Sequence, residues 1–360
     1  MNVSTISGAK TLVTVLGVAA FLPFSAFGRD KTDVLVMKNG DRITCEVKKL
    51  EGGILQIDVD YADGSISIDW LKVSRLESTA LFLVYLQDGT IYSGKIIMME
   101  SLPSTPVKVE IQPEDGQQAV VVDRTSIVQM TQTSESLLHR FNGTVTVSAL
   151  YSKGNNATQY NVGSEVEYQQ TQWGSTVRYN SNLSSSTGAA TSTRNQLDAS
   201  AHRLLPWKNY FYAGLASVLQ SSVQGIQRQT NLGMGVGWYL KNTNRVKFSV
   251  LGGIGWQRTG YVEAAGRQPS PDLAVALFTS ELETFRFKKT RLNFDASVVP
   301  ALTERGRLNS RINAVYYLKV FGKIDWNFSL YGNWDNRPPV GLPGSDYGTS
   351  IGLSWTFGNR

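Results

Sequence analysis

The chain has 360 residues, with 35 lysines and arginines against 29 aspartates and glutamates, and its mean hydropathy is -0.17. The one cysteine, Cys45, excludes an intrachain disulfide and is expected to be a core thiol. The two histidines lie far apart and form no zinc-type cluster. The net charge of +6 is scattered instead of gathered in a stripe, which argues against a nucleic-acid-binding role. We therefore expect no cofactor, metal or nucleic acid among its ligands.

The first residues are typical of a secretory signal peptide, predicted to span 1–28. Lys10 is followed by an apolar run that ends at Phe24. This run falls short of the roughly 20 residues that a membrane-spanning helix needs. Small residues follow it, so cleavage is expected after Gly28 or, alternatively, after Ala26. An uncleaved anchor is the other interpretation.

Residues 29–135 are predicted to form an all-β periplasmic module of two repeats, 33–77 and 82–131. The first strand of each repeat leads into a pair of residues that ends in glycine, Asn39-Gly40 in one repeat and Asp88-Gly89 in the other. Such pairs supply the positive φ of a two-residue hairpin turn. The repeats resemble small SH3-like or Sm-like barrels, and they are expected to pack together because each alone buries little core. The module could be a binding platform, or a plug or spacer.

Residues 141–360 are predicted to form a transmembrane antiparallel β-barrel of about 12 strands, which makes the chain all-β. The segments alternate apolar and polar positions and are separated by Gly, Asn, Asp, Ser and Pro. In the last segment Tyr347 and Ile351 share one face, whereas Gly348 and Ser350 lie on the other. Only alternate residues of a barrel strand contact lipid, which explains a low mean hydropathy in a membrane protein.

The connections between these segments alternate in length, as they do in outer-membrane barrels. Short turns are expected near Gln170, Lys208, Asn242, Lys288 and Gly322. Longer links are expected at 184–193, 259–272 and 335–345. The segment that carries Glu281, Glu283, Phe285 and Phe287 on one face is the least regular of the series. An even strand number places both ends of the barrel on the periplasmic side.

The alternation also predicts which charged side chains face the lumen. Both signs occur there, whereas a selective channel usually concentrates one sign at a constriction. Mixed charges can line a pore, or they can form ion pairs that fill a closed barrel. The candidate lumen-lining residues are Glu165, Glu167, Arg178, Asp198, His202, Lys247, Glu281, Glu283, Arg291, Asp295, Arg311 and Lys319.

Two short motifs lie near the C-terminus. Residues 331–339 read Tyr-Gly-Asn-Trp-Asp-Asn-Arg-Pro-Pro, and Asp346-Tyr347-Gly348 leads into 352–357, Gly-Leu-Ser-Trp-Thr-Phe. With these motifs the barrel segment resembles the salt-induced outer-membrane protein family, a Gram-negative barrel family of unknown function with an aromatic-Asp-x-x-Pro-Pro hairpin. The resemblance implies an outer-membrane location and an osmotic-stress setting. It implies no catalytic residue and no ligand.

Three functions stay open at this point. The first is a pore or a stress-related envelope protein, and the second is a closed barrel whose module binds an envelope partner. The third is an outer-membrane hydrolase, for which His202, Ser200 and Asp198 share one strand face. Alternate residues on a strand lie about 6 to 7 Å apart, too far for a nucleophile and its base to hydrogen bond, so we expect a non-enzymatic protein.

The expected location also predicts partners. These are the lipid and lipopolysaccharide of the outer membrane, the outer-membrane assembly machinery, and a periplasmic partner if the module is a platform. Lipopolysaccharide is anionic, so the basic balance of the chain favours this contact without making it specific.

Overall fold

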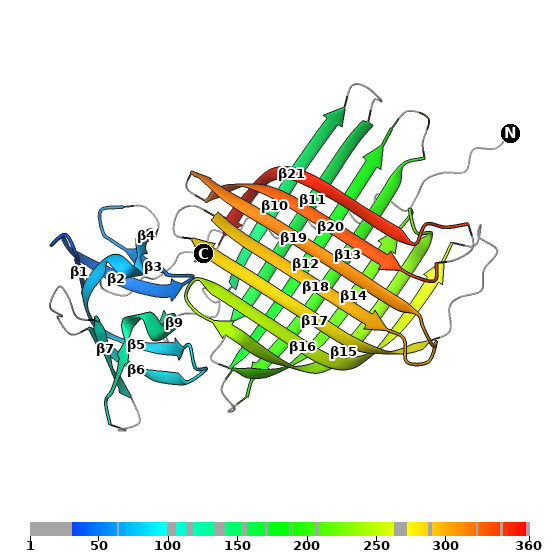
Figure 1. Ribbon diagram of the computed structural model, residues 1–360. Coiled ribbons are helices and arrows are strands. Elements are labelled where there is room, and N and C mark those ends of the chain that lie inside the picture. The colour runs from blue at the N-terminus through cyan, green and yellow to red at the C-terminus, as the bar shows by residue number, and fades with distance from the viewer. Residues whose placement is uncertain are drawn as a thin grey trace.

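The computed structural model describes residues 31–62, 65–98, 106–113, 118–132, 141–152, 157–169, 172–186, 188, 190–205, 209–262, 272–286, 290–321, 323–338 and 341–357. The predicted signal peptide lies outside these residues. The described chain forms a nine-stranded module followed by a closed twelve-stranded barrel, which confirms the predicted fold class (Figure 1). Within the described ranges, no helix has the length and apolar character needed to cross a membrane.

The module contains the same order of elements twice. In each half, four strands are followed by a single 3-10 turn and a closing strand, and β5 closes the first half while opening the second. The elements are β1 (Asp33–Met37), β2 (Arg42–Glu51), β3 (Ile54–Asp58), β4 (Ile66–Asp69), η1 (Trp70–Lys72), β5 (Val73–Leu86), β6 (Ile91–Met98), β7 (Lys108–Pro113), β8 (Val120–Asp123), η2 (Arg124–Ser126) and β9 (Ile127–Gln132). The strand order is β4-β3-β2-β1-β5-β6-β7-β8, and β9 pairs with both β2 and β5.

One apolar core spans both halves of the module. Leu35 and Val47 from the first half and Ile96 and Met130 from the second are fully buried in the same cluster. Trp70 is buried with them and donates its indole N–H to the carbonyl oxygen of Arg124, 3.1 Å away. The guanidinium of Arg124 donates in return to the carbonyl of Val73. The two halves therefore share their core and exchange hydrogen bonds across it.

The Asn-Gly and Asp-Gly turns exist, but the predicted two-residue geometry is wrong. Only the glycine of each pair, Gly40 or Gly89, has a positive φ. Two backbone hydrogen bonds close each turn. In the first turn Gly40 N–H donates to the carbonyl oxygen of Met37, and Met37 N–H donates to the carbonyl oxygen of Asp41. The reason lies in the first residue of each pair, because its side-chain oxygen accepts from the backbone N–H two residues on, as Asp88 does from Thr90. Three-residue turns with a bulged glycine result.

Cys45 is fully buried in the module core, and we therefore expect its thiol to be unreactive in the folded protein. Burial, reinforced by the nearby carboxylates of Asp33, Asp58 and Glu46, raises the pKa of its thiol to about 12. At pH 8 only about one thiol in ten thousand would then be the reactive thiolate. We expect no maleimide adduct on the native protein by intact mass, and complete modification in denaturant. Rapid modification of the native protein would contradict this placement.

The barrel is a meander in which each strand pairs with the next and the last pairs with the first. Its strands are β10 (Phe141–Ser152), β11 (Ala157–Gln169), β12 (Trp173–Ser185), β13 (Ser192–Leu204), β14 (Tyr210–Ser221), β15 (Ile226–Asn242), β16 (Val246–Tyr261), β17 (Leu273–Arg286), β18 (Thr290–Pro300), β19 (Leu308–Phe321), β20 (Ile324–Asp335) and β21 (Ser345–Phe357).

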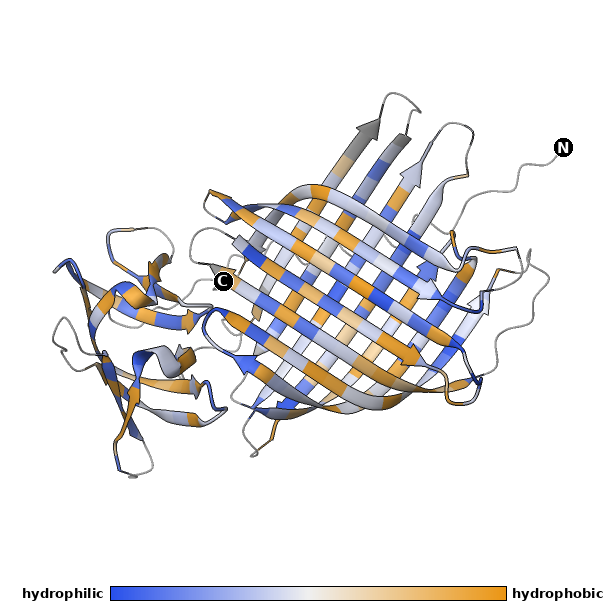
Figure 2. Cartoon of the chain, viewed as in Figure 1, coloured by the Kyte–Doolittle hydropathy of each residue, from blue (hydrophilic) through white to orange (hydrophobic). Residues whose placement is uncertain are grey.

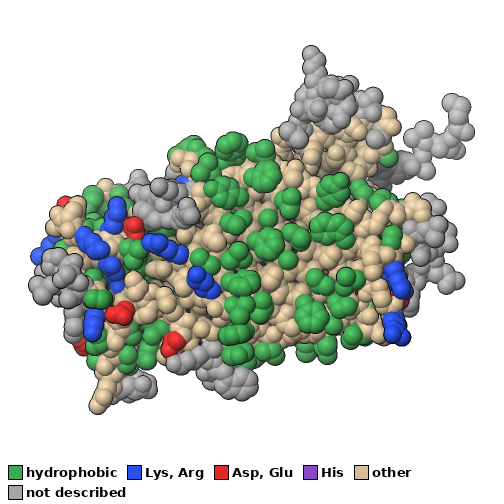
Figure 3. Space-filling model, in the orientation of Figure 1, with side chains coloured by type: hydrophobic (Ala, Val, Ile, Leu, Met, Phe, Trp, Pro, Cys, Tyr) green, Lys and Arg blue, Asp and Glu red, His purple; other side chains and the backbone are tan. Residues whose placement is uncertain are grey.

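The outer face of the barrel carries an apolar band. On β15 the alternate residues Leu232, Met234 and Val236 point outward, and Met234 is 68% exposed. On β21 the outward residues include Tyr347 and Ile351, which confirms the predicted phase of that segment. Figure 2 shows the alternation along the strands, and Figure 3 shows the hydrophobic side chains spread over the barrel wall. Exposure of so much apolar surface is typical of a face that contacts lipid.

The links between strands differ at the two ends of the barrel. The end nearest the module carries the links 170–172, 205–209, 243–245, 287–289 and 322–323. The longest links at the opposite end are 262–272, 301–307 and 336–344. The five predicted short turns and the three predicted long links are therefore found, the link predicted at 184–193 being 186–191. The link 222–225 is an exception to the alternation, because it is shorter than 205–209. The strands extend somewhat further into the long links than the sequence pattern indicates.

Candidate functional site: the barrel lumen

The module lies against one mouth of the barrel (Figure 1). The turn between β2 and β3 packs on the barrel, and a Cβ at Gly52 would lie 3.0 Å from the ring of Phe285 on β17. The next residue, Gly53, sits beside the backbone oxygen of Asn244 in the β15–β16 turn. Both glycines have a positive φ, so this turn brings its bare backbone against the barrel rim.

A second contact joins the β5–β6 hairpin of the module to the β13–β14 turn of the barrel. Asn209 donates its side-chain amide to the carbonyl of Gln87, 3.0 Å away, and accepts from the amide of Asn242 at 3.2 Å. Its φ is +64°, and it is the non-glycine residue with a positive φ in the described chain. We call Gly52, Gly53, Phe285 and Asn209 the docking contacts.

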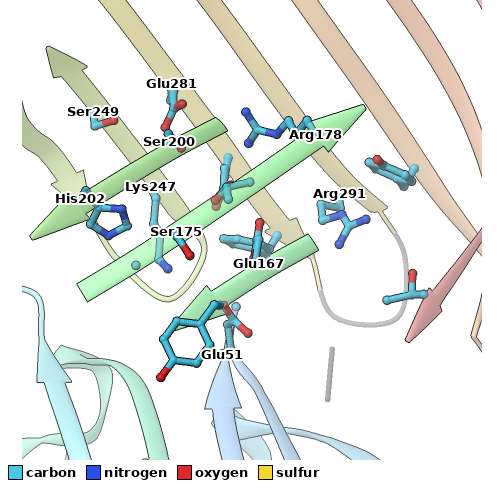
Figure 4. Close-up of a pocket in the computed structure, with 18 of the residues that line it drawn as sticks. Glu51, Glu167, Ser175, Arg178, Ser200, His202, Lys247, Ser249, Glu281 and Arg291 are labelled. Atoms are coloured by element: carbon cyan, nitrogen blue, oxygen red, sulfur yellow. The ribbon is translucent and has the colours of Figure 1, made fainter. Parts of the chain in front are cut away.

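Between the module and the barrel wall lies a first cavity of about 290 Å³. Lys49 and Glu51 line it from the module, and they form an ion pair of 3.0 Å. Figure 4 shows the barrel side chains that converge on this space and Glu51 opposite them. The candidate residues in its wall are Glu167, Arg178, His202, Lys247, Glu281, Glu283, Arg291 and Lys319.

A second cavity of about 250 Å³ lies within the barrel lumen. The two cavities share wall residues, among them Arg178, Glu281 and Glu283, so they adjoin one another at that level. The structure thus places all twelve candidate residues in the walls of the two cavities. Those that line the second cavity are Glu165, Arg178, Asp198, Glu281, Glu283, Asp295 and Arg311.

Ion pairs gather around the level where the cavities adjoin. Arg178 of β12 contacts Glu165 of β11, with 2.8 Å between Nε and Oε2. Arg311 of β19 contacts Asp198 of β13, with 2.9 Å between Nη1 and Oδ1. Because β13 and β19 are six strands apart in a ring of twelve, this second pair crosses the lumen from wall to wall. We call these four residues the charged constriction.

The charged constriction is held by neighbouring polar groups. Asp198 also accepts from the amide of Gln196 at 2.6 Å. Asp295 accepts from Asn313 at 2.8 Å and lies within electrostatic reach of both Arg178 and Arg311. Asp198, Arg311 and Asp295 therefore belong to a network of polar groups from β13, β18 and β19, which narrows the lumen more firmly than a single flexible side chain would.

Arg291 stands apart from these pairs. Its guanidinium carbon lies 4.1 Å from the ring centre of Tyr317, and its buried Nε and Nη2 atoms have no hydrogen-bond partner among the described residues. The wall of the first cavity also contains the apolar side chains Phe211, Leu215 and Leu251. The first cavity therefore combines a cationic group that has free donors with an apolar surface.

The sequence reasoning missed a second set of ion pairs, nearer the long links. Arg194 and Asp346 are 2.8 Å apart, and each side chain is only 5% exposed. Asp346 also accepts from Ser221, and Arg194 stacks over the ring of Tyr331 at 4.9 Å. The signal was present, because Arg194 shares the strand phase of Asp198. Its position near the end of the segment left it out of the prediction.

The hydrolase hypothesis finds no support in the geometry. Asp198 is taken by Arg311 and Gln196, and the ring of His202 packs edge-on against Phe211 at 5.9 Å. Within the described parts of the chain, no group of three or more His, Cys, Asp or Glu is arranged to hold a metal ion. The three residues on the β13 face therefore do not assemble into a catalytic triad.

Comparison with known proteins places the barrel in a family. Residues 145–357 match the model described as "Protein of unknown function, DUF481". A search of the curated proteins finds no match. Among solved structures, the NanC porin aligns over 59% of this chain and 100% of its own, with 12% identity and a TM-score of 0.38. The translocator domain of the autotransporter NalP from Neisseria meningitidis aligns over 60% of this chain and 87% of its own, with 12% identity and a TM-score of 0.32.

A third solved structure is the outer membrane channel DcaP of Acinetobacter baumannii. It aligns over 90% of this chain and 94% of its own, with 9% identity and a TM-score of 0.26. The family model, in contrast, matches sequence over more than half of the chain and covers β11 to β21 entirely. The chain belongs to the DUF481 family of proteins.

Proposed function

We propose that the chain is a narrow outer-membrane channel whose lumen is controlled by the charged constriction and whose periplasmic mouth is covered by the module. The observation that carries the proposal is the pair of adjoining cavities inside a closed barrel, whose walls carry charged and polar side chains beside apolar ones. Barrels of about eight strands are filled by their own side chains, whereas wider barrels leave room for a lumen.

The membrane location rests on the outer face. Apolar side chains cover the wall of the barrel, and aromatic residues such as Trp238, Trp355 and Tyr210 stand outward on the strand ends nearest the module. This is the arrangement of an outer-membrane barrel with an interfacial aromatic belt. Short turns face the periplasm in such barrels, and the position of the module beside the short turns supports a periplasmic module.

Transport instead of catalysis is the role that these residues favour. The acidic groups of the constriction are paired with arginines, and the imidazole of His202 packs against an aromatic ring. Arg291, with donors left free, would attract the anionic part of a small solute entering the first cavity. Lipid, lipopolysaccharide and the assembly machinery are the partners proposed with this location. The osmotic-stress setting stays a prediction of the resemblance.

The test is electrical. The mature full-length protein is refolded, shown to shift its gel mobility on heating, and added to planar bilayers. We expect small, steady conductance steps, since the cavities are narrow and the mouth is covered. A protein that shifts on heating and yet never conducts would overturn the channel proposal.

The second candidate is a closed barrel with the module as a binding platform for an envelope partner. The ion pair that crosses the lumen favours it, because a permanent pair would seal the barrel. The two candidates differ in one result. The unmodified protein conducts if the barrel is a narrow channel, whereas a barrel sealed by this pair stays silent until the pair is removed.

A further inference from the structure

The barrel closes where its first strand, β10, meets its last strand, β21, and this junction is the shortest of the twelve. Backbone pairing joins five residue pairs, from Gly143 with Phe357 to Val147 with Leu353. The other eleven junctions contain between nine and fifteen pairs. The wall is therefore least connected along this seam.

Both strands continue beyond their last pair. Gly352 still packs against Ser148, since a Cβ at Gly352 would lie 2.4 Å from the Ser148 side chain. Past that point, within the described residues, β10 pairs only with β11 and β21 pairs only with β20. We call this part the open half of the seam, residues 149–152 and 345–351. In Figure 1 the β10–β11 hairpin rises away from β21.

A side chain replaces a missing backbone partner in the open half. Gln159 of β11 donates its amide to the carbonyl oxygen of Thr349 on β21, at 3.5 Å. A β21 carbonyl in a fully zipped seam would accept from the backbone of β10, the strand that lies between β11 and β21. The bond shows that β11 lies within side-chain reach of β21 in the open half, where β10 and β21 have no backbone pairing.

The open half lies between lipid and lumen. On its outer side Tyr347 is 74% exposed and Ile351 is 50% exposed. On its inner side Ser350 lines the second cavity, beside Tyr331 of β20 and Thr146 of the paired part of β10. A bare strand edge is unfavourable in hydrocarbon, but it is tolerated where a polar, water-filled cavity lies behind it. Ser350 therefore brings the open half into contact with the second cavity.

The second cavity has two kinds of wall. Leu215, Leu277 and Val299 make one side apolar, whereas Asn161 and Arg194 belong to a polar side. A purely polar solute would leave the apolar side chains of this cavity in contact with water. A hydrocarbon would leave the polar side chains without hydrogen-bond partners. An amphipathic molecule, with an acyl chain and an anionic or amide head, matches both walls.

We propose that the open half of the β10–β21 seam is a lateral portal through which an acyl-chain amphiphile passes between the second cavity and the outer leaflet. The portal rests on the proposed outer-membrane location and does not require that the barrel conduct ions. It adds to the axial path a lateral route for a different class of molecule.

The first test measures the seam itself in the full-length protein. Register partners Val145 and Trp355 are both changed to cysteine (V145C/W355C), and so are Val147 and Leu353 (V147C/L353C). The third pair, A149C/I351C, continues the same register into the open half. With oxidant, the first two pairs should form disulfides quickly and the third at least about tenfold more slowly, because a disulfide requires Cβ atoms close together. Equal rates for all three pairs would overturn the open seam.

The second test follows the ligand. Vesicles of phosphatidylethanolamine and phosphatidylglycerol contain a fatty acid with a terminal diazirine, and the labelled residues are mapped by mass spectrometry. We expect adducts on the inward residues Leu215 and Leu277 as well as on the outward Met234. Joining A149C to I351C with a short bis-maleimide should remove the inward adducts alone. Inward adducts that survive this lock, or adducts on outward residues only, would overturn the portal.

Two controls separate the portal from other outcomes. Each variant must shift its mobility on heating, which shows that the barrel has folded. Ion conductance of the locked protein should stay unchanged, so loss of the channel and loss of the portal are read separately. A disulfide between two chains through I351C alone would identify a second copy at this edge and would also overturn the portal.

Discussion

Replacing Arg311 by alanine is expected to raise single-channel conductance and to shift selectivity toward cations. The substitution removes the side chain that crosses the lumen to Asp198 and leaves that carboxylate facing the open path. One uncompensated charge at a narrow point would change the cation-to-anion permeability ratio about fivefold, or about 1 kcal/mol. Reversal potentials in a salt gradient across a planar bilayer measure this ratio.

The opposite variant, Asp198→Asn, provides the control. It leaves Arg311 without its carboxylate, so the permeability ratio should move toward anions while conductance again rises. Exchanging the two residues in one double variant should return the ratio close to its original value, since the pair is restored in reverse. If both single variants shift the ratio in the same direction, this pair does not lie on the ion path.

Loosening the docking contacts should uncover the barrel mouth beside the module and increase access to the first cavity. Asn209→Gly keeps the positive φ and removes the hydrogen bond to Gln87, and Phe285→Ala removes the ring on which Gly52 packs. Together these losses amount to about 2 kcal/mol, which shifts the docking equilibrium about thirtyfold. Both conductance and the labelling rate of a cysteine at His202 should rise.

The matched control for this double variant is Phe278→Ala. It removes the same aromatic ring from β17, but on the outward face and away from the module. It should leave both conductance and the labelling of H202C as they are. Slow labelling of H202C in the loosened protein would mean that the module does not cover the mouth, and faster labelling in the control would point to a general loss of barrel stability.

The fold was predictable because lipid imposes a simple code on the strands. Outward residues such as Met234 and Ile351 contact lipid and are apolar, whereas their neighbours along the strand face the lumen and are polar. The alternation in the sequence therefore predicts the strands of the barrel wall. The irregular segment with Glu281 and Glu283 belongs to the same code, since both residues line the cavities. Phe287, which shares that pattern, lies outside the described residues.

The contacts across the lumen were not predictable. Alternation says that Arg311 and Asp198 face inward, but it does not say that β13 and β19 stand opposite each other. That relation depends on the strand number and on the register of every intervening junction. For the same reason the docking of the module on the barrel mouth could not be read from either part alone, because Gly52 and Phe285 lie in separate segments without any shared pattern.

The long strand β5 affects how the module can respond to load. It pairs with β1 in its first part and with β6 and β9 in its second, so one uninterrupted strand carries both halves. Loss of β5 from either half would also remove the strand with which the other half pairs. We therefore expect the module to unfold in a single cooperative step. A force applied to one half of the module would therefore reach the other half directly through β5.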